Sequence, residues 1–235
     1  MPEDFRGAPV IFAGNMSLFR QIYKLLRWEL TLEWRDRYAL GSVLLYVVAT
    51  VVIVYLALLQ GLNADTFNAL YWIILFFGAT VAAGRSFLRE GGRRHLYYYT
   101  LADPLALLFS KLLYNLLVIW LISGLTFLLL QLFANQISIP APLPLFLATV
   151  LGGVGLAAIL TFVSALAARA GGNGTLMAVL SFPLVIPLLK LLVDAGTYAM
   201  DTGIDDPLRP VYLILAVDLL AVAVAVVLFP FVWRD

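Results

Sequence analysis

Long runs of apolar residues, separated by short polar segments, make up most of this chain. Uncharged and largely apolar segments occupy residues 39–60, 66–84 and 176–189, the apolar segment 211–233 carries one charge, and a further charge-free run extends from 112 to 168. A helix needs about 20 apolar residues to cross about 30 Å of hydrocarbon at 1.5 Å per residue. Each of the four shorter segments therefore predicts one membrane-spanning helix. The span that begins at residue 176 is expected to extend to residue 193.

The charge-free run is too long for one span and is interrupted near its middle. Residues 135–144 (NQISIPAPLP) contain three prolines and two amide side chains, and proline disrupts a helix because it lacks the backbone N–H. The run therefore predicts two spans, at 112–134 and 145–168. We expect an all-α membrane protein whose six transmembrane helices form a single domain over 39–233.

Residues 16–38 carry a different pattern, typical of an amphipathic helix. Ser17 is its expected N-cap. At 100° per residue an apolar stripe collects Phe19, Ile22, Tyr23, Leu26, Leu30 and Trp34. One flank is basic and contains Arg20, Lys24, Arg27 and Arg35. This pattern suits an interfacial helix with its basic side chains at lipid headgroups, although a helix packed on a partner protein has the same pattern. The preceding residues 1–15 lack the features of a cleavable signal peptide and predict a flexible tail.

The composition supports a membrane protein with little chemistry of its own. Hydrophobic residues make up 63% of the chain and charged residues 12%, whereas soluble domains carry about 25% charge. The chain has no cysteine and one histidine, which excludes disulfides, thiolate metal sites and multi-histidine metal sites. It also lacks the Gly-x-x-x-x-Gly-Lys-Ser/Thr phosphate-binding motif. We therefore expect no catalytic residues, no metal site and no use of ATP by this chain alone.

Basic residues gather on one side of the predicted spans. Six spans place both termini on the same side, and all Lys and Arg residues except Lys190 and Arg209 belong to that side. The loops on the far side are acidic, with Asp65, Asp194, Asp201, Asp205 and Asp206. Cytoplasmic loops carry the excess of Lys and Arg, so both termini are predicted to be cytoplasmic.

The predicted cytoplasmic loop 85–111 is the strongest candidate for an interaction site. It contains clustered arginines, a Gly91-Gly92 turn and three consecutive tyrosines at 97–99. One interpretation is an anchored turn, with arginines at headgroups and tyrosines in the aromatic belt. The alternative is a short helix that docks on a soluble partner and transmits motion to the membrane.

Prolines and charges inside the later spans are further candidates. Pro183 and Pro187 predict a kink or break in the fifth span, as either a static kink or a moving gate. Lys190 and Asp218 are ionisable residues inside spans, where a charge costs about 2.5–3.5 kcal/mol on insertion scales. We therefore predict an ion pair between these two residues, with either a structural or a functional role.

Small residues inside two spans predict close helix packing. In the run LGGVGL, Gly153 is followed four residues later by Ala157, and the second span contains Gly78, Ala79, Ala82 and Ala83. Small side chains allow neighbouring helix backbones to approach closely. We expect packing rather than ligand binding at these positions.

Three stretches of this sequence resemble the CcmB family. They are KLLRWELTLEWRDRYALGSVLLYVV at 24–48, FLREGGRRHLYYYTLADPLALLFSKLLYN at 87–115 and TFVSALAARAGGNGTLMAVLSFPLVIPLL at 161–189. The resemblance extends from about Lys24 to Leu192. Members of this family are the membrane subunits of the cytochrome c maturation ABC transporter, also called haem exporter protein B.

The resemblance implies an ABC-2-type permease in the bacterial cytoplasmic (inner) membrane. Its implied partners are a CcmA-like ATPase subunit, a CcmC-like haem-handling membrane subunit, a small helper subunit and a CcmE-like periplasmic haem chaperone. ATP hydrolysis would drive haem export or release of the haem-loaded chaperone. ATP and haem are then expected on the partner subunits, with no cofactor bound by this chain.

The resemblance also assigns ATPase coupling to the long loop. The implied coupling residues are Phe87, Arg89, Glu90, Arg93, Arg94, Leu96 and Tyr97. An ABC-2-type permease for another cargo, such as a lipid, a drug or a glycan, predicts the same topology and remains the alternative. A membrane-embedded enzyme or a passive scaffold is a third hypothesis, but an enzyme needs polar side chains converging at one depth, and the spans offer few.

Overall fold

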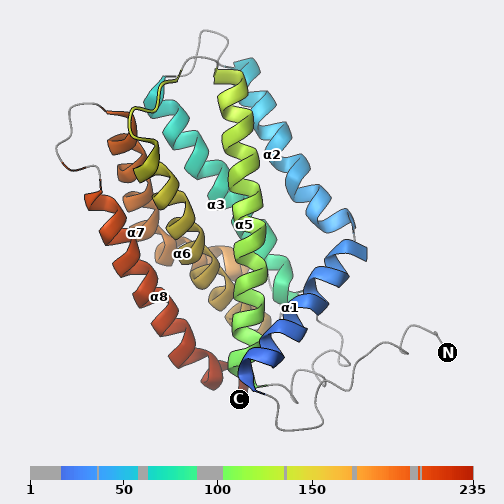
Figure 1. Cartoon of the computed structure of the whole chain (residues 1–235). Helices are drawn as coiled ribbons and strands as arrows, with labels where there is room; N and C mark the ends of the chain where they lie inside the picture. The colour runs from blue at the N-terminus through green and yellow to red at the C-terminus, as the bar shows by residue number, and fades with distance from the viewer. Residues whose placement is uncertain are drawn as a thin grey trace.

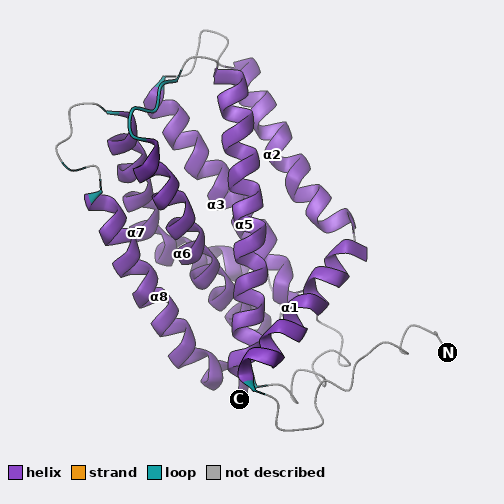
Figure 2. Cartoon of the chain, viewed as in Figure 1, coloured by secondary structure: helices purple, strands orange, loops and turns teal. Residues whose placement is uncertain are grey.

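The computed structural model describes residues 17–35, 37–57, 63–88, 103–134, 137–170, 174–201, 206 and 208–234. These residues form seven helices and no strand (Figures 1 and 2). The helices are α1 (Leu18–Arg35), α2 (Arg37–Ala57), α3 (Ala64–Leu88), α5 (Pro104–Ala134), α6 (Pro142–Arg169), α7 (Gly174–Met200) and α8 (Arg209–Arg234). The predicted tail at 1–15 lies outside the described residues.

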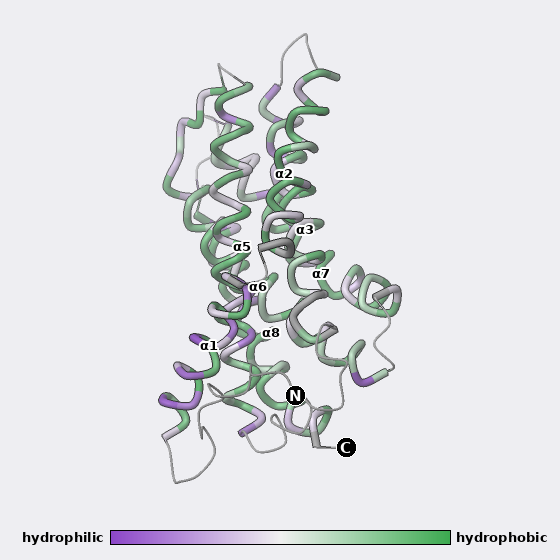
Figure 3. The backbone as a smooth tube through the Cα atoms, turned by 90° about the vertical axis from the view of Figure 1, so that its right-hand side faces the viewer, coloured by the Kyte–Doolittle hydropathy of each residue, from purple (hydrophilic) through white to green (hydrophobic). Residues whose placement is uncertain are grey.

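Six of these helices, α2 to α8, are long and apolar enough to cross a membrane. They run alternately up and down the bundle in Figure 1, while α1 lies obliquely at the lower end and leads into α2. Figure 3 shows hydrophobic residues along the bundle and repeated hydrophilic residues on α1. The predicted all-α fold with six span-capable helices is confirmed.

Some helix ends differ from the sequence prediction. α5 begins at Pro104, earlier than the predicted 112, and α7 continues to Met200, beyond the predicted 193. The Leu105 N–H donates to the Asp103 carboxylate at 2.9 Å, and proline is favoured in the first turn because its missing N–H would have no helical partner. Asp103 and Pro104 thus start α5 inside the segment predicted as a loop.

The predicted interruption between α5 and α6 is present. Residues 137–141 are not helical, and α6 begins at Pro142. Pro142 and Pro144 fit in the first turn of α6, where no helical hydrogen bond is lost. The Ala141 N–H donates to the Ala199 carbonyl at 3.1 Å and links this connection to the end of α7.

The centre of the bundle is formed by α3 and α6. About 67% of each of these spans is buried, against 17% of the α2 span and 22% of the α8 span. Glycines bring α6 close to its neighbours: a Cβ at Gly153 would lie 2.7 Å from Trp120 Nε1, and one at Gly155 would lie 2.7 Å from Leu188. The prediction that small residues serve close packing is confirmed at Gly153, and Ala157 is fully buried.

α1 uses a narrower apolar face than the predicted stripe. Leu25 is buried, and Ile22 and Leu26 pack partly buried against the helix bundle. Other members of the stripe remain exposed, namely Phe19, Tyr23, Leu30 and Trp34. Three of the four exposed members of the stripe are therefore aromatic, whereas the members that pack are aliphatic.

Candidate functional site

A buried ion pair joins α1 to α5 at the lower end of the bundle. Lys111 of α5 is fully buried, and its Nζ lies 2.7 Å from Glu29 Oε1 of α1. The same Nζ lies 5.1 Å from the ring centroid of Phe87, at the end of α3. We call Glu29, Phe87 and Lys111 the α1–α5 junction. It fixes three chain segments against one another just beside the predicted coupling segment.

Aromatic packing extends the junction to α8. The Phe87 ring lies 6.2 Å from the Phe229 ring and 6.0 Å from the Trp233 ring, and the latter two stack at 5.6 Å. Arg169, at the end of α6, lies over the Trp233 ring and donates to the Trp233 carbonyl. The ends of α3, α6 and α8 are thereby tied together around Phe87.

The ion pair at the junction is important for stability because both of its charges are withdrawn from solvent. The side chains of Lys111 and Glu29 are 0% and 13% exposed. Removing one partner of a buried pair typically costs 3–5 kcal/mol, because the other charge is left uncompensated. The cation over the Phe87 ring adds a smaller favourable term. The junction therefore holds α1 in a defined position on the bundle.

Most of the predicted coupling residues lie outside the described residues. These are Arg89, Glu90, Arg93, Arg94, Leu96 and Tyr97. Phe87 is described, and its side chain is buried at the junction rather than displayed for docking. The helices on either side of this segment, α3 ending at Leu88 and α5 beginning at Pro104, both have their adjoining ends at the lower end of the bundle in Figure 1.

A second polar cluster joins α3 to α7. The Asn68 amide donates to the Val193 carbonyl at 2.8 Å and to Thr197 Oγ1 at 3.1 Å, and its carbonyl oxygen accepts from Trp72 Nε1 at 2.9 Å. Gly196 has no space for a Cβ because Asn68 lies directly against it. Inter-helix hydrogen bonds of this kind hold membrane helices together where water is absent.

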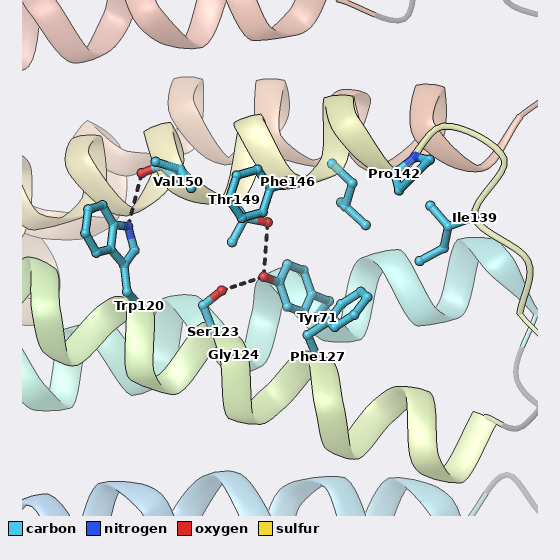
Figure 4. A pocket seen from close by; sticks show the side chains of 11 residues that line it. Tyr71, Trp120, Ser123, Gly124, Phe127, Ile139, Pro142, Phe146, Thr149 and Val150 are labelled. Carbon is cyan, nitrogen blue, oxygen red and sulfur yellow. Dashed lines mark hydrogen bonds between the residues drawn. The ribbon is translucent and has the colours of Figure 1, made fainter.

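A cavity of about 680 Å³ lies between α5 and α6, on the half of the bundle nearer their connection. Figure 4 shows Tyr71 of α3 on its inner side, with the phenol pointing at Ser123 and Thr149. The phenol oxygen lies 2.6 Å from Ser123 Oγ and 3.1 Å from Thr149 Oγ1. Trp120 Nε1 donates to the Val150 carbonyl at 3.2 Å, so α5 and α6 are also bonded at the cavity edge.

The predicted ion pair between Lys190 and Asp218 is wrong. Lys190 Nζ bonds Asp194 Oδ2 at 2.8 Å, one turn along α7, and the Lys190 side chain is 74% exposed. Asp218 is buried, and neither of its oxygens has a hydrogen-bond partner among the described residues. Its carboxylate lies against Gly155 of α6, where no Cβ fits. The two charged groups therefore do not meet. Lys190 pairs instead with Asp194, which lies four residues further along the same helix.

Pro183 and Pro187 do not break α7. The helix is continuous from Gly174 to Met200, and both prolines lie on its exposed side. Each proline still removes one backbone hydrogen bond from the turn before it. Whether this region acts as a static kink or a moving gate stays a prediction.

A group of three or more His, Asp or Glu side chains that could hold a metal does not occur among the described residues. Comparison with curated proteins gives no match for this chain. Comparison with family models gives a match to the model described as CcmB protein, over residues 20–233. The chain belongs to the CcmB family. The resemblance noted in the sequence is thus confirmed over nearly the whole chain.

Membership of the CcmB family indicates the kind of complex in which this chain works. A CcmB protein is the membrane permease subunit of an ABC transporter for cytochrome c maturation, the haem exporter of that system. The six span-capable helices agree with a multi-pass membrane protein. As a CcmB subunit, the chain acts within a complex and so has partner subunits.

Sequence reasoning missed the residues that carry most of the inter-helix bonding. The predicted loop 85–111 ends at Lys111, although the apolar residues on both sides of Lys111 indicate burial. Asn68 and Tyr71 carry no spacing signal, because each bonds to residues far away in the chain. Only the packed structure brings these partners together.

Proposed function

We propose that this chain couples ATP hydrolysis by a separate, CcmA-like subunit to haem export or to release of the haem-loaded periplasmic chaperone. The observation that carries the proposal is the CcmB family match over residues 20–233. The other proposed partners are a CcmC-like haem-handling subunit, a small helper subunit and a CcmE-like chaperone. ATP and haem then bind to these partners, and this chain transmits motion.

The proposed setting is the bacterial inner membrane, with both termini in the cytoplasm. Support comes from the basic residues, which concentrate at the end of the bundle where α1 begins and α8 ends. In this orientation α1 lies at the cytoplasmic interface. Its exposed Phe19, Tyr23 and Trp34 are suited to the headgroup region, where amphipathic aromatic rings concentrate.

The proposed path of coupling runs from the segment around Arg89 and Glu90 into the bundle. That segment connects α3 to α5, and the α1–α5 junction clamps the adjoining helix ends through a buried ion pair. A push on this segment by the ATPase therefore reaches α1, α3 and α5 together. Phe87 serves the proposal as a buried anchor rather than as a docking contact.

The experiment is deletion of the gene followed by measurement of covalently bound haem in c-type cytochromes. We expect the covalent haem to be lost and to return with the wild-type gene. Normal cytochrome c in the deletion strain overturns the proposal.

A second measurement addresses the coupling segment. The double variant Arg89→Ala/Glu90→Ala is expected to lose co-purification of the ATPase subunit while the chain itself still accumulates in membranes. Arg209→Ala is the matched control, because Arg209 is an exposed basic residue at the opposite end of the bundle. Unchanged co-purification in the double variant contradicts the proposed docking position.

A further inference from the structure

The cavity between α5 and α6 opens on the outer surface of the bundle. Trp120, Gly124 and Phe146 line it and are themselves exposed. Gly124 has open space where a Cβ would lie, with nothing within 4 Å. The cavity is thus a gap between two span-capable helices, and its mouth lies on their exposed apolar surface.

The cavity wall is largely apolar, and its polar side chains form hydrogen bonds within the protein. The hydroxyls of Tyr71, Ser123 and Thr149 bond to one another, and the Trp120 N–H bonds the Val150 carbonyl. The remaining lining residues are apolar: Gly124, Phe127, Ile139, Pro142, Leu145 and Phe146. No charged side chain is among the described residues that line it. The wall offers no ionic partner, and its three hydroxyls, which share two hydrogen bonds, leave one donor for a polar ligand.

This wall argues against water and against a charged ligand as the occupant. Buried waters are stable where they can make about three hydrogen bonds to polar groups that lack partners, and this wall leaves one hydroxyl donor in that state. An empty cavity forfeits the dispersion contacts of all its lining atoms. Hydrocarbon restores these contacts, and it is the medium into which the mouth opens.

We propose that this cavity binds one acyl chain of a membrane phospholipid. The chain enters between α5 and α6 past Trp120 and Phe146, while its charged headgroup stays outside, since the cavity lacks a counter-charge. Bound in this way, the chain fills the gap between the two spans and sets their separation. The site is independent of the haem and ATP steps proposed above.

Gly124→Leu tests the site, because Leu at this position projects into the open space. The matched control is Gly41→Leu on α2, where a Cβ also meets nothing within 4 Å but which does not line this cavity. The full chain, with the subunits that co-purify, is reconstituted in vesicles of phosphatidylethanolamine carrying a photoreactive diazirine in the acyl chain. Adducts are mapped by peptide mass spectrometry.

We expect adducts concentrated on the cavity-lining residues of α5 and α6, several-fold fewer in Gly124→Leu and unchanged in Gly41→Leu. Equal labelling in Gly124→Leu and wild type overturns the proposal. So does labelling spread evenly over exposed positions, which is the pattern of lipid surrounding the protein. Labelling by a photoreactive free fatty acid but not by the phospholipid also overturns it.

A measurement on the unmodified chain keeps the proposal falsifiable if Gly124→Leu does not fold. Phospholipids with brominated acyl chains quench tryptophan fluorescence on contact, and Trp120 lines the cavity. We expect quenching of Trp120, isolated as the difference between wild type and Trp120→Phe. A Trp120 signal that brominated chains leave unquenched contradicts an acyl chain in the cavity.

Discussion

The two halves of the bundle hold their helices together in different ways. At the lower end, a buried ion pair joins α1 to α5, and stacked aromatic rings lie between the ends of α3 and α8. In the other half, neutral hydroxyls bridge α3, α5 and α6 beside a cavity of about 680 Å³. Breaking a buried ion pair costs several kcal/mol, whereas losing a neutral hydrogen bond between membrane helices costs less.

The first prediction concerns the buried pair, where we expect the largest effect. Glu29→Gln removes the carboxylate beside the buried Lys111 ammonium and should destabilise the chain by about 3–5 kcal/mol. The measurement is the thermal unfolding midpoint in detergent, followed by size-exclusion chromatography. Arg27→Gln, an exposed charge on the same helix, is the control and should change little. If both variants behave alike, the junction does not anchor α1.

A charge exchange sharpens this result. Glu29→Lys combined with Lys111→Glu keeps one charge of each sign at the junction, so it should recover part of the stability lost by either single reversal. A double variant that is less stable than both single variants contradicts the pairing.

The second prediction tests close packing in the centre of the bundle. Gly155→Ala places a methyl group against the Asp218 carboxylate and the Leu188 side chain, where no space exists, so these side chains must shift. Overpacking of this kind costs about 1–3 kcal/mol. Gly41→Ala is the matched control, because its Cβ meets open space. Equal unfolding midpoints for the two variants would show that α6 is not closely packed there.

The third prediction concerns the hydroxyl cluster in the neutral half. Tyr71→Phe removes the phenol that bonds Ser123 and Thr149 but keeps the ring. Hydrogen bonds between membrane helices contribute about 0.6 kcal/mol on average, so we expect a loss of about 1 kcal/mol, well below that of Glu29→Gln. A loss as large as that of Glu29→Gln would remove the contrast between the two halves.

The fourth prediction has the smallest effect and the opposite sign. Gly124→Ala adds a methyl group to open space within α5 and should stabilise the chain by about 0.5–1 kcal/mol, because alanine favours the helix over glycine. The same unfolding measurement applies. Destabilisation by this methyl group contradicts an open space at Gly124.

The sequence was sufficient for the architecture because span length and charge-free runs are local properties. The spans, the interruption before Pro142 and the packing role of Gly153 could all be predicted. The start of α5 at Pro104 was missed, although Asp103 followed by proline is a helix-start signal. The Asp103-Pro104 pair is a local signal for a helix start, but the polar residues before it favour a loop.

Partner choice could not be predicted, because it depends on how helices rotate against one another. Lys190 and Asp218 lie on neighbouring helices, yet Lys190 bonds Asp194 and Asp218 faces Gly155. Lys111 and Glu29 belong to segments with no shared pattern, and only packing brings them together. The cavity likewise has no signature in the sequence, since its lining residues come from three helices and the connection between α5 and α6.

The length of α5 has a mechanical consequence. Its 31 residues extend for about 46 Å, longer than the roughly 30 Å of a hydrocarbon core. Lys111 and Ser123 lie on this one continuous rod about 18 Å apart. With Ser123 as a fulcrum, a tilt of about 5° displaces the Pro104 end by about 2.5 Å. The α1–α5 junction and the cavity therefore lie on one continuous helix, so a tilt of α5 at one site changes the position of the other without a loop between them.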